Sequence, residues 1–137
     1  MAEVREEGEL GASVDEVWKL VGDFGGLIEA MGLPVKVEGE GIGQTRSIPM
    51  GDPPTVERLE ELDAAKKKVV YSIQSGTLPV ADYVSTMQLS PVGDGRTKLE
   101  WSSTFQPGAG ASEDDAVKVV TGIYQGGIAF LQGRFGA

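Results

Sequence analysis

Residues 97–135, TKLEWSSTFQPGAGASEDDAVKVVTGIYQGGIAFLQGRF, place an alternating strand shortly before a long amphipathic helix. In Thr97–Phe105 every second residue lies on one face of the strand, and that face carries Leu99, Trp101, Ser103 and Phe105. Ser112 then begins a capping box, and the acidic residues after it complement the positive end of a helix dipole. We therefore expect a strand with an inward apolar face and a helix that begins at Ser112.

The helix that follows Ser112 has one broad apolar side. At about 100° per residue, one stripe and its flanks collect Val117, Val120, Tyr124, Ile128, Leu131 and Phe135, with Ala116, Ile123, Gly127 and Phe130 beside them. Polar residues such as Lys118 and Gln125 lie on the opposite side. A helix with so wide an apolar side fits against a concave sheet.

Residues 35–105 consist of short runs rich in Val, Ile, Thr, Tyr and Trp, which clusters of Gly, Pro and Asp separate. Such a pattern predicts strands with tight turns, and short connections favour antiparallel neighbours. We expect six strands, at Val35–Glu38, Thr45–Met50, Thr55–Asp63, Lys68–Ser75, Asp82–Ser90 and Thr97–Phe105. One face of the fifth of these runs should also point inward, with Tyr83, Ser85, Met87 and Leu89.

Before these strands, the chain predicts one strand at Val4–Leu10 and then two short helices. Ser13–Glu16 is a capping box that opens the first helix, and Asp23 begins a second helix that ends near Met31. The sequence contains no internal repeat and no long linker. We therefore expect a single α+β domain over residues 1–137.

Composition excludes several classes of function. A formal net charge of −9 opposes binding to nucleic acid, and the basic run Lys66–Lys68 is too short to offset it. Without cysteine or histidine there is no thiolate nucleophile, imidazole base or zinc site, so we expect no metal and no cofactor. The absence of a long apolar stretch and the acidic N-terminus predict a cytoplasmic protein without integral membrane association. These observations do not decide the oligomeric state, so the protein can be a monomer or an oligomer.

The order of elements resembles the helix-grip fold of the START-like, or Bet v 1-like, superfamily (SRPBCC). Four segments are similar to its polyketide cyclase/dehydrase and lipid transport branch: Ser13–Phe24, Gly43–Arg46, Glu57–Asp63 and Leu78–Tyr83. The resemblance covers nearly the whole chain. It implies a curved seven-stranded antiparallel sheet wrapped around the long C-terminal helix, with a cavity for a hydrophobic small molecule.

A more distant similarity to plant abscisic-acid receptors implies five cavity residues: Glu57, Tyr83, Ser85, Ile123 and Gly127. Three departures argue against a hormone receptor. Met31 stands where those receptors have the lysine that binds the hormone carboxylate, and the gate loop is reduced to Met50–Pro54. The latch before Tyr83 also lacks its His and Arg.

Four further residues are candidates for the cavity lining: Tyr71, Met87, Trp101 and Tyr124. Packing in the core is the competing interpretation for the aromatic residues. A carboxylate that faces an apolar cavity is desolvated, which suits Glu57 to act as a general acid or base. The alternation around Glu57 does not decide which face is inside. Arg46 is interpreted as a surface or rim cation, with an inward contact to Glu57 as the alternative.

Three functions are consistent with these observations. The first is binding or transport of a lipid, polyketide or similar metabolite. The second is an enzyme of the polyketide cyclase/dehydratase kind, in which Glu57, Tyr83 or Tyr71 would move protons. The third is a module that binds a protein partner through its surface. The resemblance implies a cavity, and no catalytic constellation is recognisable, so the sequence favours the first.

Overall fold

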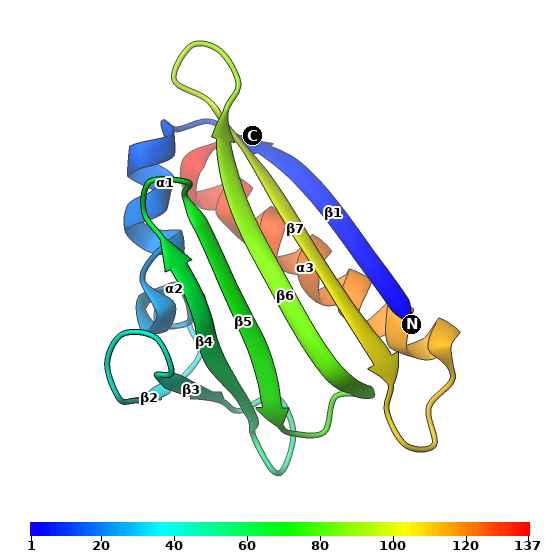
Figure 1. The fold of residues 1–137 in the computed structure, drawn as a ribbon. Helices are drawn as coiled ribbons and strands as arrows, with labels where there is room; N and C mark the ends of the chain where they lie inside the picture. The colour runs from blue at the N-terminus through cyan, green and yellow to red at the C-terminus, as the bar shows by residue number, and fades with distance from the viewer.

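The computed structural model describes all residues 1–137 and shows an α+β fold with one antiparallel sheet. The seven strands are ordered β1-β7-β6-β5-β4-β3-β2. The elements are β1 (Ala2–Leu10), α1 (Val14–Val21), α2 (Phe24–Ala30), β2 (Lys36–Glu38), β3 (Thr45–Ile48), β4 (Thr55–Asp63), β5 (Lys68–Ser75), β6 (Val80–Pro91), β7 (Thr97–Pro107) and α3 (Glu113–Phe135). Figure 1 shows α3 lying along one face of the curved sheet, with α1 and α2 beside β4. The predicted helix-grip architecture is confirmed.

All three helices begin at the capping residues that the sequence indicates. The Ser13 hydroxyl accepts a hydrogen bond from the Glu16 amide at 3.3 Å, which opens α1. Asp23 does the same for α2, and the Ser112 hydroxyl accepts from the Asp115 amide at 3.1 Å at the start of α3. Each cap satisfies one of the amide groups that a helix leaves without an internal partner.

Every strand boundary lies within two residues of the prediction. β4 and β5 have the predicted bounds, β1, β2, β3 and β7 each differ at one end, and β6 begins at Val80 rather than at Asp82. Val80 and Ala81 pair with the end of β7 before a register shift, and Asp82 has a positive φ of 52° at that shift. A bulge of this kind interrupts the alternation from which a strand is read in sequence.

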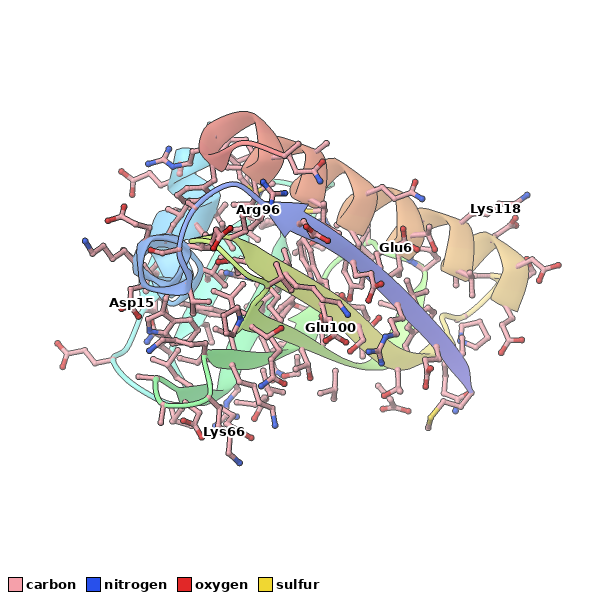
Figure 2. The ribbon with its side chains drawn as sticks, turned by 90° about the horizontal axis from the view of Figure 1, so that it is seen from above. Glu6, Asp15, Lys66, Arg96, Glu100 and Lys118 are labelled. Atoms are coloured by element: carbon pink, nitrogen blue, oxygen red, sulfur yellow. The ribbon has the colours of Figure 1, made fainter.

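The core lies between the concave face of the sheet and α3. The inward faces predicted for β6 and β7 are confirmed, because Met87, Leu89, Leu99 and Phe105 are all at most 3% exposed. Gly127 allows α3 to approach the sheet, since a Cβ at this position would lie 2.5 Å from the Trp101 ring. The charged side chains of Asp15, Lys66 and Lys118, which Figure 2 labels, point outward. None of the helices is long and apolar enough to cross a membrane.

Candidate ligand-binding cavity

A cavity of about 160 Å³ lies between α2, α3 and the concave face of the sheet. Its wall consists of 15 residues, 13 of them hydrophobic: Leu27, Ile28, Met31, Leu33, Arg46, Ile48, Met50, Glu57, Tyr71, Ile73, Leu78, Tyr83, Trp101, Val120 and Ile123. Leu33 is exposed, and Met31, Met50, Ile73, Leu78 and Ile123 are partly exposed, so the cavity is bordered by apolar side chains where it meets solvent. The cavity is therefore an apolar chamber with a hydrophobic entrance.

Arg46 and Glu57 are the two charged residues in the wall, and they form a buried ion pair. They are direct partners on neighbouring strands β3 and β4, and Arg46 Nε donates to Glu57 Oε1 at 2.7 Å. Arg46 Nη1 donates to the Phe24 carbonyl, also at 2.7 Å. The guanidinium lies over the Phe24 ring, 3.9 Å from its centroid, and 4.9 Å from that of Tyr71. These contacts hold Arg46 in place from three sides.

The interpretation of Arg46 as a surface or rim cation is wrong. Its side chain is only 4% exposed, and that of Glu57 is 10% exposed. The signal in the sequence was Ile48, which lies two residues from Arg46 and therefore on the same face of β3. Because the two charges offset each other, the cavity presents no net charge to a ligand.

A network of buried hydroxyl groups adjoins the cavity. Trp101 Nε1 donates to the Tyr71 hydroxyl and to Ser85 Oγ, each at 3.1 Å. Ser85 Oγ donates to the Ser102 carbonyl at 3.1 Å and lies 2.8 Å from the Tyr124 hydroxyl, which also contacts the hydroxyl of Tyr83. The Trp101 and Tyr124 rings stack with their centroids 4.4 Å apart.

The three tyrosines of this network are neutral hydrogen-bonding groups. Burial raises the pKa of Tyr71, Tyr83 and Tyr124 above its ordinary value. For Tyr71 the nearby Tyr124 and Glu57 raise the pKa further, while Arg46 opposes them with a smaller effect. At neutral pH all three hydroxyls therefore keep their protons.

The structure distributes the candidate site residues between the wall of the cavity and the layers behind it. Five of them line the wall: Glu57, Tyr71, Tyr83, Trp101 and Ile123. Ser85 and Tyr124 lie behind the wall and hold its polar groups through hydrogen bonds. Met87 lies in the core at 1% exposure, and Gly127 packs under Trp101. Sequence reasoning missed the residues from α2, because helix periodicity alone does not show that a buried face borders a void.

A second hollow, of about 510 Å³, lies beside the loop between β5 and β6. Backbone pairing of these strands stops at Ser72 and Val84, so their ends diverge around the loop. The hollow is polar and more open than the cavity, and it shares Ile73, Leu78 and Tyr83 with the cavity wall. The smaller cavity is the better candidate for a ligand site, because it is less open and more apolar than the hollow.

A concave antiparallel sheet that closes over one long helix and encloses an apolar cavity defines a START-like, or Bet v 1-like, protein. The chain belongs to the polyketide cyclase/dehydrase and lipid transport family, which matches residues 1–136. Family and fold together indicate that it binds a hydrophobic ligand. No curated protein matches the sequence.

Solved structures agree with this assignment. A protein from Bacillus thuringiensis is 32% identical, with a TM-score of 0.86 and 98% of each chain covered. The protein XoxI from Bacillus cereus is 31% identical, with the same TM-score, 98% of this chain covered and 96% of that one. Norcoclaurine synthase from Thalictrum flavum shares the fold at 18% identity, with a TM-score of 0.71 and coverage of 96% and 91%.

Proposed function

We propose that this protein binds a hydrophobic small molecule, a lipid, polyketide or similar metabolite, and carries it without chemical change. The observation that supports the proposal is the enclosed cavity, whose wall is apolar apart from one internally paired set of charges. An apolar pocket with a few oriented polar groups is the usual form of a small-molecule site. Lipid transport is also part of the family description.

The polar groups of the cavity favour binding over acid-base catalysis. Efficient proton transfer needs a group whose pKa lies near the working pH. Burial moves the pKa of Tyr71 and Tyr83 away from neutrality, so both are poor proton donors to a reacting substrate. Glu57 Oε1 accepts a hydrogen bond from Arg46, so only the second carboxylate oxygen of Glu57 is open to a bound molecule. These features support a carrier.

The same fold also serves catalysis in a relative. A structure of norcoclaurine synthase holds dopamine and hydroxybenzaldehyde, at 17% identity to this chain over 93% of its length. The likeness supports binding of small aromatic molecules in the cavity of this protein, whether or not they react there. An experiment must therefore separate binding from turnover.

Native mass spectrometry of the protein purified from its own cells provides that test. A carrier retains one co-purifying molecule, and the same molecule is recovered unchanged after incubation and extraction. Ile123→Phe places a larger side chain in the cavity wall and should abolish the retained mass, whereas Lys118→Ala on the outer side of α3 should not. Conversion of the bound molecule to a product would contradict the proposal, and so would retention by Ile123→Phe.

A further inference from the structure

The hydroxyl network has a defined direction, which can be derived by counting protons. Ser85 gives its one hydroxyl proton to the Ser102 carbonyl, so the Tyr124 hydroxyl must be the donor in its contact with Ser85. Because the single hydroxyl proton of Tyr124 goes to Ser85, the Tyr83 hydroxyl must donate to Tyr124. Trp101 donates to both Ser85 and Tyr71. Among the hydroxyls that these bonds join, only that of Tyr71 has a proton without an assigned acceptor; the buried Ser103 hydroxyl beside Tyr124 also has no partner.

One acceptor in the same wall is also free. Glu57 Oε1 accepts from Arg46, whereas Glu57 Oε2 has no partner in the protein. Glu57 pairs with Ile73 and Leu59 pairs with Tyr71, so Glu57 and Tyr71 are diagonal neighbours on the inner face of β4 and β5. Side chains in that relation are within reach of each other and of a group between them. The cavity thus offers one donor and one acceptor side by side.

The size of the cavity limits the ligand further. Pockets for drug-sized molecules measure about 300–1,000 Å³, whereas this cavity measures about 160 Å³. An apolar cavity of about 150 Å³ is sufficient for a benzene molecule. One ring with a small substituent is therefore the largest compact ligand that fits without expansion. Aromatic side chains from β5, β6 and β7 supply a matching surface, namely Tyr71, Tyr83 and Trp101.

We propose that the ligand class is a neutral single-ring phenol or aryl alcohol, whose hydroxyl accepts from Tyr71 and donates to Glu57 Oε2. A hydroxyl is the smallest group that uses both free positions at once. A carboxylate would place its charge beside the unpartnered oxygen of Glu57, and an alkane or a toluene ring would leave both groups unpaired. This inference rests on the proposed function, since it names the ligand of the same cavity.

Equilibrium dialysis with four probes tests the inference: phenol, toluene, benzoate and dodecanoate. Tyr71→Phe removes the free donor, and Trp101 keeps Ser85 as an acceptor, so the variant should fold. We expect it to weaken phenol binding by about 2- to 12-fold, which is the range for the net contribution of one hydrogen bond, and to leave toluene binding unchanged. Glu57→Gln should also weaken phenol binding. Glu60→Gln, on the outer face of β4 in its pair with Arg58, is the matched control and should have no effect.

The outcomes separate this inference from the proposed function. Binding of dodecanoate without binding of phenol overturns the ligand class but leaves a carrier of hydrophobic molecules. An equal loss of phenol and toluene in Tyr71→Phe overturns the role of the hydroxyl. Failure of all four probes to bind contradicts the proposed function itself. Phenol binding that Tyr71→Phe weakens selectively supports the inference.

Discussion

Three kinds of group hold the guanidinium of Arg46: a carboxylate, a backbone carbonyl and a pair of aromatic rings. Such an arrangement does not by itself add stability, because taking two charges out of water costs about as much as their attraction returns. Its effect is to fix the position of Glu57 at the cavity wall. The pair is therefore better understood as a device that orients a polar group than as a source of folding energy.

Removing one partner of this pair tests that interpretation. Arg46→Met leaves the carboxylate of Glu57 buried without compensation, which should lower the free energy of unfolding by about 3–5 kcal/mol. The double variant Arg46→Met/Glu57→Leu removes both charges and should return to within about 1 kcal/mol of the parent or exceed it. Urea denaturation measures both changes. If the double variant is as unstable as the single one, the pair itself stabilises the fold.

The residue scale is also where sequence reasoning was weakest. Leu59 is fully buried and shares the inner face of β4 with Glu57. Val56 and Leu62 lie on the opposite face by simple alternation, and Leu62 is 41% exposed. Because both faces of the strand carry apolar residues, alternation alone could not assign Glu57. The local pairing with β3 decides its direction.

At the scale of elements, Gly127 sets how closely α3 approaches the sheet. Gly127 faces Trp101, where a Cβ would come within 2.5 Å of the ring, whereas a Cβ on Gly126 would meet nothing within 4 Å. The two positions have the same cost in helix propensity but different surroundings. Gly127 therefore has a structural function that Gly126 lacks.

A matched pair of alanine substitutions measures this difference. Gly126→Ala should raise the free energy of unfolding by about 0.5–1 kcal/mol, since alanine is the better helix former in open space. Gly127→Ala should lower it by about 1–3 kcal/mol, because the added methyl group forces Trp101 away from its stacking position on Tyr124. Chemical denaturation gives both values. Equal effects of the two substitutions would show that α3 can move away from the sheet without cost.

The start of α3 provides a second test at this scale. Ser112→Ala removes the hydroxyl that accepts from the Asp115 amide, and should cost about 0.5–2 kcal/mol. Ser112→Asp retains an acceptor at the same position and should recover most of the loss. The denaturation midpoints of the two variants provide the comparison. An unchanged midpoint in Ser112→Ala would mean that the first turn of α3 contributes nothing to global stability.

At the scale of the whole molecule, the fold could be predicted because its signals are local. The caps at Ser13, Asp23 and Ser112 and the alternation in β6 and β7 each arise within a few residues. The cavity is different, since its wall combines residues from α2, α3 and five strands. Its volume depends on how far α2 and α3 stand from the sheet. No segment of the sequence encodes that distance alone, so the size of the ligand could not be predicted.

All three tyrosines of the chain belong to the buried network, and this links the stability of the whole molecule to alkaline pH. Burial raises the pKa of each in the folded state, whereas in the unfolded chain a tyrosine ionises near pH 10. Below about pH 10 both states keep the protons and this contribution to stability is complete. Above about pH 10 the unfolded chain releases protons that the folded protein retains, so stability falls as pH rises.

The expected slope is about 1.4 kcal/mol per pH unit for each tyrosine that ionises only on unfolding. Urea denaturation at several pH values above about 10 measures this slope. Tyr71→Phe removes one of the three groups and should reduce the slope by about 1.4 kcal/mol per pH unit, and this difference excludes the background from lysines that titrate in the same range. Tyrosinate absorption should rise together with the loss of tryptophan burial, because ionisation requires unfolding. If tyrosinate forms while Trp101 remains buried, solvent enters the folded cavity, and the network is more open than the hydrogen bonds among Tyr71, Ser85 and Tyr124 imply.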